Sequence, residues 1–575
     1  MLSNSIVAGA LVSAYVLVLV LLLNPTLPID PRLLAPLAGR VGVFYAANGT
    51  AAACVLLVFR QLFGRDRFSP AWISVTVVAW LAAVAAAGGG LLMWANLQTF
   101  AVVLEARTVR ALAQATLVLA AVSCLLLLTA VLERRGARRR ALAAWVGSLC
   151  VVSVVVPLAL RGASTVEPLG ARSLGGLMDV PASDRRARVT VIALDAGSLE
   201  LVTNATSEGR LPNFGRILDA GAVTHLATLH PTSADAVWAA VATGKLPQKN
   251  GVRSAAVYRL AGRPSSPPIE LLPDFCFATG LIRLGILAEE PRTSRSIRAR
   301  TLWTILSAAG VRVGVVNFPL TYPAPPVRGF IVSDAWARRG DDLAGAGDLA
   351  SLYPARLSEQ AAAIRKTADG SAMPPAFAGL SERHRLPARI DRLYEQVQRA
   401  FSAADPVDVS VTRFQSPDPI GHYFLRYAMP SRFGDVSDDD RRRFGGVLEA
   451  HYTLVDEAIG RAIAELGPDD LLLVVSAYGM EPLSVWKRVL EFLIGDPETS
   501  GSHEAAPDGF LMAYGAPVAR TRQLRRASVV DVLPTILYFL GLPVARDMDG
   551  YARADLFLRT YTEEHPITFI PTYDR

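Results

Sequence analysis

Three residues whose side chains commonly ligate metal ions lie near the ends of predicted strands. Asp418 and His422 are four positions apart in the sequence SPDPIGH, so one helical turn would place both side chains on one side. His503 lies in the polar segment GSHE, ahead of an apolar run. One carboxylate and two imidazoles form a ligand set suited to Zn²⁺ or Mn²⁺, with a position left for water or substrate. We therefore predict a divalent-metal site, although an Asp–His pair with this spacing is more often a surface pair.

A further candidate metal ligand is Asp195, which ends the apolar run VIAL. In an open α/β sheet, functional groups gather at the carboxyl ends of the strands. An aspartate in this position is more often a helix N-cap or a turn residue. Its assignment to a metal site therefore depends on the residues around it.

The chain beyond residue 187 has the pattern of an α/β domain. Short apolar runs are typical of strands that are buried on both faces, and they occur at Val189–Leu194, Val311–Asn317, Asp408–Phe414 and Leu471–Ser476. Helical stretches between them include Tyr394–Phe401 and Phe444–Leu466. This alternation predicts a mainly parallel sheet sandwiched by helices over residues 187–575. Two irregular segments, about 254–300 and 338–386, are expected to be insertions that cap the strand ends.

Residues 1–160 have the composition of a membrane region. The chain is 51% hydrophobic with a mean hydropathy of +0.33, and the excess lies almost entirely in this part. Five segments approach the roughly 20 apolar residues that a membrane-spanning helix needs: Ile6–Leu23, Val41–Phe59, Ala71–Leu97, Leu112–Leu132 and Ala141–Leu160. The second is the weakest, because Asn48, Gly49 and Thr50 interrupt it. A linker at residues 161–186 then leads to the α/β domain.

Arginines in the connections predict the orientation of these spans. The connection after the second span contains Arg60, Arg65 and Arg67, and the one after the fourth contains five arginines between residues 134 and 140. Cytoplasmic loops carry an excess of Lys and Arg. We therefore expect an integral protein of the cytoplasmic membrane, with its N-terminus in the cytoplasm and its C-terminal domain periplasmic or extracellular.

The formal net charge of +7 raises the question of nucleic-acid binding. No stripe of Lys and Arg is interleaved with stacking aromatic residues, and no zinc-finger or helix-turn-helix pattern occurs. Arginines that flank apolar spans explain the basic balance better. We expect a membrane partner and no nucleic acid.

Several ordered sequence blocks of the α/β domain resemble a known family. Asp195-Ala-Gly is followed by EGRLPNFGRILDAGA from Glu208, by Pro231-Thr-Ser, and by WAAVATGKLP from Trp238. The block VDVLPTILYFLGLP begins at Val530, and Asp547-Met-Asp-Gly follows it. This order is similar to that of the type I phosphodiesterase/nucleotide pyrophosphatase branch of the alkaline phosphatase superfamily. The resemblance covers residues 189–557 and implies an alkaline-phosphatase-like fold.

In that family two metal ions flank a Ser or Thr nucleophile. The resemblance implies that Asp418, His422 and His503 form one metal site and that Asp195 belongs to the other. The family's Ser-Asp-His-Gly block appears here with Ala477 and Tyr478 in its middle, so both ligands that it would give to the second metal are missing. We therefore expect a divalent cation, zinc or manganese, with the number of ions open between one and two.

The nucleophile also departs from the family pattern. Its position falls on Ala234, while Ser233 and Thr232 lie one and two residues earlier. A small shift of the turn would present Ser233 or Thr232, and Asp235 would supply a replacement carboxylate. Alternatively, a metal-activated water attacks, since a bound metal lowers the pKa of water to about 7.

The sequence thus predicts a membrane-anchored, metal-dependent phosphodiesterase or phosphotransferase acting on a lipid-linked or envelope phosphoester. The alternative is a catalytically degenerate domain that serves as a binding or assembly component of a membrane complex, because fold does not guarantee activity.

Overall fold

A computed structural model describes residues 1–63, 73–132, 139–162, 187–338, 349–368, 375–434, 436–484, 487–489, 491, 496–520 and 524–574. It divides into two compact units. The helical unit comprises Met1–Ala171 and Ala256–Pro291, and the α/β unit comprises Arg172–Ala255 and Arg292–Arg575. Most of the predicted linker, residues 161–186, lies outside the described residues, as do Arg65, Arg67, Arg134, Arg135 and Arg138.

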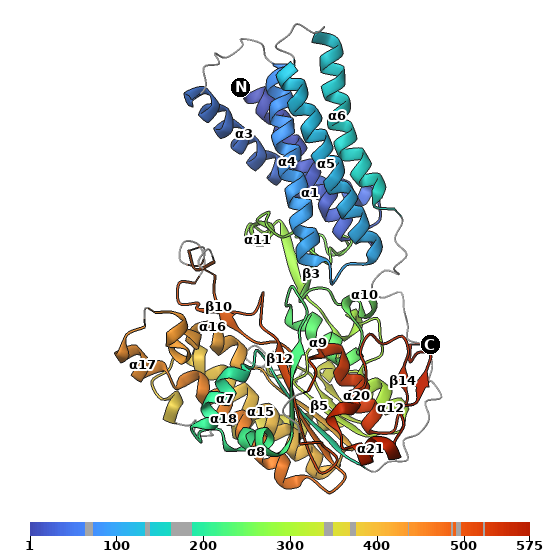
Figure 1. The fold of residues 1–575 in the computed structure, drawn as a ribbon, viewed down its shortest axis with the longest axis vertical. Coiled ribbons are helices and arrows are strands. Elements are labelled where there is room, and N and C mark those ends of the chain that lie inside the picture. Colours follow the sequence, from blue (N-terminus) through green and yellow to red (C-terminus); the bar gives the residue numbers. More distant parts are fainter. Residues whose placement is uncertain are drawn as a thin grey trace. The chain divides into compact units, whose positions relative to one another are not determined.

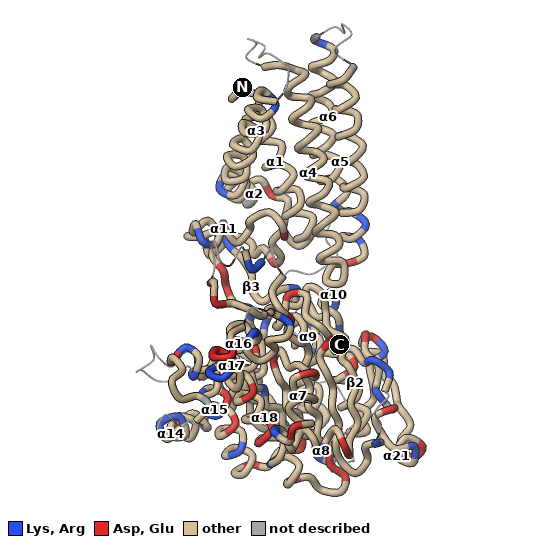
Figure 2. Tube along the Cα trace, turned by 60° about the vertical axis from the view of Figure 1, so that its left-hand side comes forward, with Lys and Arg blue, Asp and Glu red and all other residues tan. Residues whose placement is uncertain are grey.

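Five apolar helices of the helical unit confirm the five predicted spans (Figure 1). They are α1 (Leu2–Leu23), α3 (Val43–Phe63), α4 (Val75–Phe100), α5 (Ala106–Leu132) and α6 (Arg139–Leu160). The short α2 (Pro31–Leu37) and the π-helical turn η1 (Ala38–Gly42) lead into α3, so that the second span runs over Leu34–Phe63. Charged residues are sparse along these helices (Figure 2), which are long and apolar enough to cross a bilayer.

The second span is the least apolar of the five, with a mean hydropathy of 1.8, as expected, but its polar residues do not interrupt the helix. The side chains of Asn48 and Thr50 donate to the carbonyls of Phe44 and Ala46, at 2.8 and 2.7 Å, so their polar groups are paired within the helix. A Cβ added at Gly49 would lie 3.1 Å from the Cα of Gly9 in α1. The glycine therefore permits close packing of two helices in an apolar environment.

The first predicted insertion differs from our expectation. Residues 256–291 belong to the helical unit and pack against its apolar helices. They form strands β3 (Ala256–Leu260) and β4 (Leu287–Pro291), paired antiparallel, and helix α11 (Ala278–Arg283). The apolar residues of this insertion explain the difference, because Leu260, Ile269, Leu281 and Leu287 are buried in one cluster with residues of α1 and α3.

The α/β unit is built on a nine-stranded sheet with the order β13-β2-β12-β9-β1-β8-β5-β6-β7. The strands are β1 (Val189–Leu194), β2 (Ala222–Ala227), β5 (Val313–Val316), β6 (Gly329–Val332), β7 (Leu352–Tyr353), β8 (Val409–Phe414), β9 (Leu471–Ser476), β12 (Gly509–Tyr514) and β13 (Ala527–Ser528). The five strands from β9 to β6 are parallel to one another, whereas β12 and β7 run antiparallel to their neighbours. The predicted mainly parallel sheet is confirmed.

Helices lie on both faces of this sheet, as a sandwiched sheet requires. Figure 1 shows one group of helices on one side: α7 (Leu199–Ser207), α8 (Pro212–Ala220), α15 (Glu382–Ala404), α16 (Pro417–Ala428) and α18 (Val447–Glu465). A second group lies on the other side: α9 (Ala234–Thr243), α12 (Leu302–Ala308) and α20 (Val532–Phe539). The central strand β9, with the sequence LLLVVS, is buried along its whole length, which explains why it reads as a continuous apolar run.

The described part of the second insertion, 338–386, also differs from a cap over the strand ends. Strand β7 pairs with β6 and extends the edge of the sheet, and helix α14 (Ser358–Ala368) packs on α15. Buried Ala361 of α14 lies in one cluster with Tyr394 and Val397 of α15. Residues 339–348 and 369–374 of this insertion lie outside the described residues.

Candidate metal centre

The carboxyl ends of three neighbouring parallel strands bring the predicted residues to one edge of the sheet. Strand β1 pairs with both β8 and β9, and Leu194 is opposite Phe414 on one side and Ser476 on the other. The three strands therefore end at the same level of the sheet. Asp195 follows β1 there, the segment after β8 carries Asp418, and the segment after β9 carries Tyr478. This edge is where an open α/β sheet places its functional groups.

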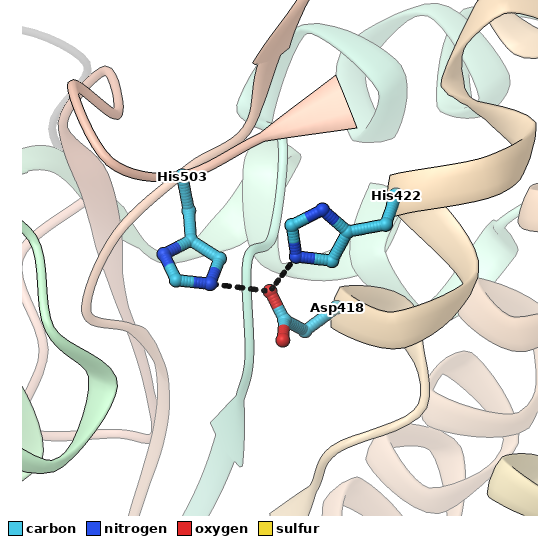
Figure 3. Close-up of side chains that lie close together, drawn as sticks. All are labelled: Asp418, His422 and His503. Carbon is cyan, nitrogen blue, oxygen red and sulfur yellow. Dashed lines mark ion pairs between the residues drawn. The ribbon is translucent and has the colours of Figure 1, made fainter. Parts of the chain in front are cut away.

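The predicted metal ligands Asp418, His422 and His503 converge, as Figure 3 shows. Their candidate ligand atoms all lie within 4.8 Å of one another. Oδ1 of Asp418 is 3.8 Å from Nε2 of His422 and 3.7 Å from Nε2 of His503. Asp418 and His422 share one face of α16 because they are one helical turn apart. His503 comes from the segment after β11 (Gly501–Ser502), which is about 80 residues away along the chain.

The hydrogen bonds of these side chains leave their ligand atoms available. Nδ1 of His422 lies 2.8 Å from the carbonyl oxygen of Gly501, so this nitrogen donates and Nε2 keeps its lone pair toward Asp418. Oδ1 of Asp418 is buried without a hydrogen-bond partner among the described residues. Ligand atoms of a tetrahedral zinc site are about 3.3–3.5 Å apart, so small side-chain movements would bring these three into ligating positions. The residues fit one divalent cation.

The electrostatics of the site also favour a cation. Burial raises the pKa of the Asp418 carboxyl, and the His503 and His422 imidazoles offset part of that rise. The nearby Asp195 carboxylate raises it further. A buried carboxylate with an unpaired oxygen is costly unless a positive charge compensates it. A cation between Asp418 and the two imidazoles would supply that charge.

Asp195 has a different partner from the one expected for a ligand of a second metal. Both of its carboxylate oxygens accept hydrogen bonds from the guanidinium of Arg413, and Nε1 of Trp238 donates to its Oδ1 at 2.7 Å. The side chains of Arg413 and Asp195 are only 7% and 3% exposed. Asp195 is thus already neutralised by a fixed organic cation, and it is not among the residues that cluster with Asp418.

Ala477 and Tyr478, at the expected ligand positions after β9, are both fully buried. Burial raises the pKa of the Tyr478 phenol well above its usual value, and the Asp195 and Asp418 carboxylates add to the effect, so the hydroxyl is neutral. Its Oη has no hydrogen-bond partner in the part of the chain that the structure describes. The Tyr478 ring lies 5.3 Å from that of His503, between centroids. Tyrosine therefore fills this position as a bulky neutral group.

The two candidate nucleophiles precede helix α9 and differ in their environment. Thr232 is buried, and its hydroxyl donates to the carbonyl of Leu229 at 2.9 Å. Ser233 is the N-cap residue of α9, is half-buried, and makes no side-chain capping bond. The amide of Thr232 donates to the carbonyl of Glu504 at 3.1 Å, which places this turn beside the His503 segment. Of the two hydroxyls, that of Ser233 is the less constrained.

Two residues of the site were not predicted from the sequence. Arg413 was missed although it is a charged residue at the end of an otherwise apolar strand, VSVTRF, which is itself a signal. Asp391 of α15 is buried and accepts from the backbone amides of Gln415 and Ser416, at 3.0 and 2.8 Å. It thereby fixes the turn that leads into α16 and its Asp418. No local pattern in α15 distinguishes Asp391 from a surface carboxylate.

The α/β unit matches a known family. A family model described as type I phosphodiesterase/nucleotide pyrophosphatase matches residues 189–514, which is more than half of the chain. The match includes Asp195, Asp418, His422 and His503. A comparison with curated proteins found no match.

Three solved structures illustrate what the α/β unit is similar to. A murine ectonucleotide pyrophosphatase/phosphodiesterase 5, an inactive variant in complex with AMP, is 13% identical over 65% of this chain and 100% of its own, with a TM-score of 0.38. The alkaline phosphatase PafA is 11% identical over 66% and 100%, with a TM-score of 0.43. A phosphonoacetate hydrolase from Sinorhizobium meliloti in complex with phosphonoformate is 17% identical over 55% and 65%, with a TM-score of 0.32.

Proposed function

Because the chain belongs to the type I phosphodiesterase/nucleotide pyrophosphatase family, we propose that it is a membrane-anchored, metal-dependent phosphodiesterase or phosphotransferase. In this proposal one divalent cation, zinc or manganese, binds Asp418, His422 and His503. The observation that carries the proposal is the convergence of these three side chains, with their ligand atoms within 4.8 Å of one another. When bound, such a cation would polarise a phosphoryl oxygen and neutralise developing negative charge.

The residues around this centre have separate roles in the proposal. The Gly501 carbonyl orients His422, and Asp391 holds the turn that carries Asp418. Ser233 is the nucleophile, at the N-terminus of α9, where the helix dipole favours an anionic phosphoryl group. If Ser233 does not attack, a water molecule takes its place.

Arg413 takes the electrostatic role of a second cation in this proposal. The guanidinium is held against Asp195 in a buried pair, at the strand end where the family resemblance implies the other metal. Although burial alone would lower the pKa of Arg413, the Asp195 carboxylate raises it, so the group keeps its charge. Arginine is well suited to phosphoryl oxygens because its planar guanidinium donates several hydrogen bonds. A fixed charge of this kind cannot bridge two oxygens as a metal does, but it can stabilise one.

We further propose that the substrate is a lipid-linked or envelope phosphoester, since the five apolar helices indicate integration into a membrane. The arginine distribution supports a cytoplasmic N-terminus and a periplasmic or extracellular α/β unit. Turnover confined to soluble nucleotides, by the full-length protein in proteoliposomes that also contain candidate phospholipids, would contradict the lipid-linked substrate.

A catalytically degenerate domain is the second candidate function. It is favoured by Ala477 and Tyr478, which remove two ligand positions, and by the pairing of Asp195 with Arg413. Such a domain would bind a phosphorylated or anionic partner within a membrane complex without turning it over. The two candidates differ in whether the metal centre binds a cation and supports turnover.

The decisive experiment measures metal content and activity together on the full-length protein in detergent. After equilibrium dialysis against Zn²⁺ or Mn²⁺, we expect one ion per chain by mass spectrometry of the metal, and turnover of an aryl phosphodiester. His422→Ala and His503→Ala should each weaken metal binding by about tenfold or more and abolish turnover. His225→Ala, an exposed histidine of β2, is the matched control and should change neither. A bound ion without turnover would favour the degenerate domain, and no bound ion would contradict the metal centre.

A further inference from the structure

The tip of the insertion in the helical unit, residues 274–285, has an unusual surface. Phe275, Phe277 and Leu284 are 70%, 75% and 65% exposed, whereas Ala278 and Leu281 of α11 between them are buried. Phe275 and Phe277 also have positive φ angles, 61° and 53°, which aromatic residues rarely adopt. The backbone is therefore held so that these large apolar side chains point away from the protein. Large exposed apolar side chains gathered in one short segment mark an interaction surface.

The tip is fixed to two apolar helices by hydrogen bonds to its backbone. Asn96 of α4 accepts from the amide of Asp274 at 2.8 Å and donates to its carbonyl at 3.1 Å. The hydroxyl of Tyr45 in α3 donates to the carbonyl of Cys276 at 3.0 Å. Phe275 lies between these two anchors, and Phe277 follows directly after the second. The height of both phenylalanines along the helix bundle is thus set by Asn96 and Tyr45.

The positions of the anchors within their helices give that height. The second span, Leu34–Phe63, has 30 residues, about 45 Å of helix, which exceeds the roughly 30 Å of bilayer hydrocarbon. Tyr45 lies 11 residues from its start, and Asn96 lies four residues before the end of α4, Phe100. Asn96 is thus about 6 Å from the end of α4, near the boundary between hydrocarbon and headgroups, whereas Tyr45 lies about 16 Å inside its span. The tip is therefore at the level of a bilayer interface.

We propose that the tip is a membrane-interface anchor, in which Phe275, Phe277 and Leu284 insert between phospholipid headgroups beside the apolar helices. Its occupant is the lipid of the same bilayer that the helices span, because the insertion packs on these helices and its anchor Asn96 lies near the end of α4. The phenylalanines gain an apolar environment at the acyl-chain boundary, as aromatic residues of interfacial elements do. Because the chain crosses to the α/β unit at residues 255–256 and 291–292, the anchor adds two covalent connections between the bilayer and that unit.

Site-directed spin labelling of the full-length protein in phospholipid vesicles tests this proposal. The four cysteines, Cys54, Cys124, Cys150 and Cys276, are first replaced by Ala or Ser. A nitroxide is then attached in turn at Phe275→Cys and Phe277→Cys. Two controls are Glu289→Cys, on exposed β4 of the same insertion, and Tyr551→Cys, which is 78% exposed in the α/β unit. Because all four positions are exposed, none of the labels disturbs a packed core.

The measurement compares collisions of each label with oxygen, which partitions into lipid, and with a water-soluble nickel chelate. At positions 275 and 277 we expect oxygen collisions to exceed chelate collisions, and at 289 and 551 we expect the reverse. Chelate collisions at 275 and 277 equal to those of the controls would overturn the proposal. Low access to both reagents would also overturn it, because the tip would then be covered by protein and not by lipid.

Discussion

Arg413 and Asp195 form a buried ion pair at the centre of the candidate active site. The guanidinium donates to both carboxylate oxygens and also reaches the carbonyl of Asn317 at 3.3 Å. The carboxylate that the family resemblance assigns to a second metal is therefore satisfied by a side chain of the same chain. This buried ion pair bears on both the stability and the chemistry that we expect.

Removing one partner of the Arg413–Asp195 pair should destabilise the α/β unit strongly. Asp195→Asn or Arg413→Met leaves a buried charge without its counter-charge, and each should lower the free energy of unfolding by about 3–5 kcal/mol. The double variant removes both charges and should recover most of that loss. The free energies of unfolding of the two single variants and the double variant are measured by denaturant titration of the full-length protein in detergent, with tryptophan fluorescence as the signal. Arg442→Met, which breaks an exposed pair with Asp439, is the control and should cost less than about 1 kcal/mol.

Tyr478→Phe should stabilise the protein. The Tyr478 hydroxyl is buried without a partner among the described residues, and an unsatisfied buried polar group costs about 1–3 kcal/mol. The phenylalanine ring keeps the contact with His503 and leaves no cavity. A rise in the unfolding midpoint by thermal denaturation checks this. A fall would instead reveal a polar partner for the hydroxyl, such as an ordered water or the bound cation.

Ser233→Ala should reduce turnover by about 10³-fold or more while metal binding is unchanged, because the variant loses the nucleophile but no ligand. Thr232→Ser retains the hydroxyl that donates to Leu229 and should keep turnover within about threefold of the wild type. Steady-state kinetics of the two variants on an aryl phosphodiester, with their metal content measured in parallel, tests both expectations. Full turnover by Ser233→Ala would exclude Ser233 as the nucleophile and leave the Thr232 hydroxyl or a water molecule as the attacking group.

His451→Leu should make the protein more resistant to acid. His451 is fully buried, neither ring nitrogen has a partner among the described residues, and its ring packs on Phe377. Burial lowers its pKa from 6.5 to about 3. The folded pKa is below the unfolded one, so stability is intact above pH 6.5 and falls between pH 6.5 and about 3, by about 1.4 kcal/mol per pH unit. Leucine removes this dependence and the unpaired ring nitrogens, so the gain in the free energy of unfolding should be larger at pH 4.5 than at pH 7. An equal acid sensitivity of both proteins would contradict the assignment.

Asn24→Ala should release the insertion from the apolar helices. The Asn24 side chain accepts from the amides of Glu270 and Leu271 and donates to the carbonyl of Leu271, at 2.8–2.9 Å. Loss of these buried bonds should weaken the docking by about 1–3 kcal/mol. Trypsin should then cleave near Arg263 and Arg283 about tenfold faster or more. Among the described residues, the exposed amide of Asn48 bonds within its own helix, so cleavage of the control Asn48→Ala should match the wild type.

The strand and helix pattern could be predicted because it rests on local periodicity. Val189–Leu194 and Leu471–Ser476 form strands with the predicted bounds, since runs of β-branched and aliphatic residues are buried on both faces of the sheet. The proximity of Asp418 and His422 could also be predicted locally, because the two residues are one turn apart in α16. The polar triplet at Asn48 correctly marked the least apolar span, but hydropathy did not show that Asn48 and Thr50 bond to the preceding helical turn and leave the helix continuous.

The insertion at residues 256–291 shows where local patterns were insufficient. Its short strands and turns read as irregular, and nothing in their periodicity identifies the surface against which Leu260 and Ile269 are buried. That surface is formed by α1 and α3, more than 200 residues earlier in the chain. Docking of this kind depends on the shapes of two distant surfaces, which only the folded chain defines.

The sequence by itself determined the five apolar spans, the mainly parallel sheet, and a carboxylate and an imidazole on one helix face, since each follows from spacing over fewer than about 30 residues. The family resemblance, and not local spacing, implied that His503 joins them. Only the tertiary structure decided that Asp195 is paired with Arg413 and that the insertion docks on the helices. The physical reason is that parallel strands remote in sequence share one edge, so the side chains that meet there are chosen by sheet order and not by chain distance.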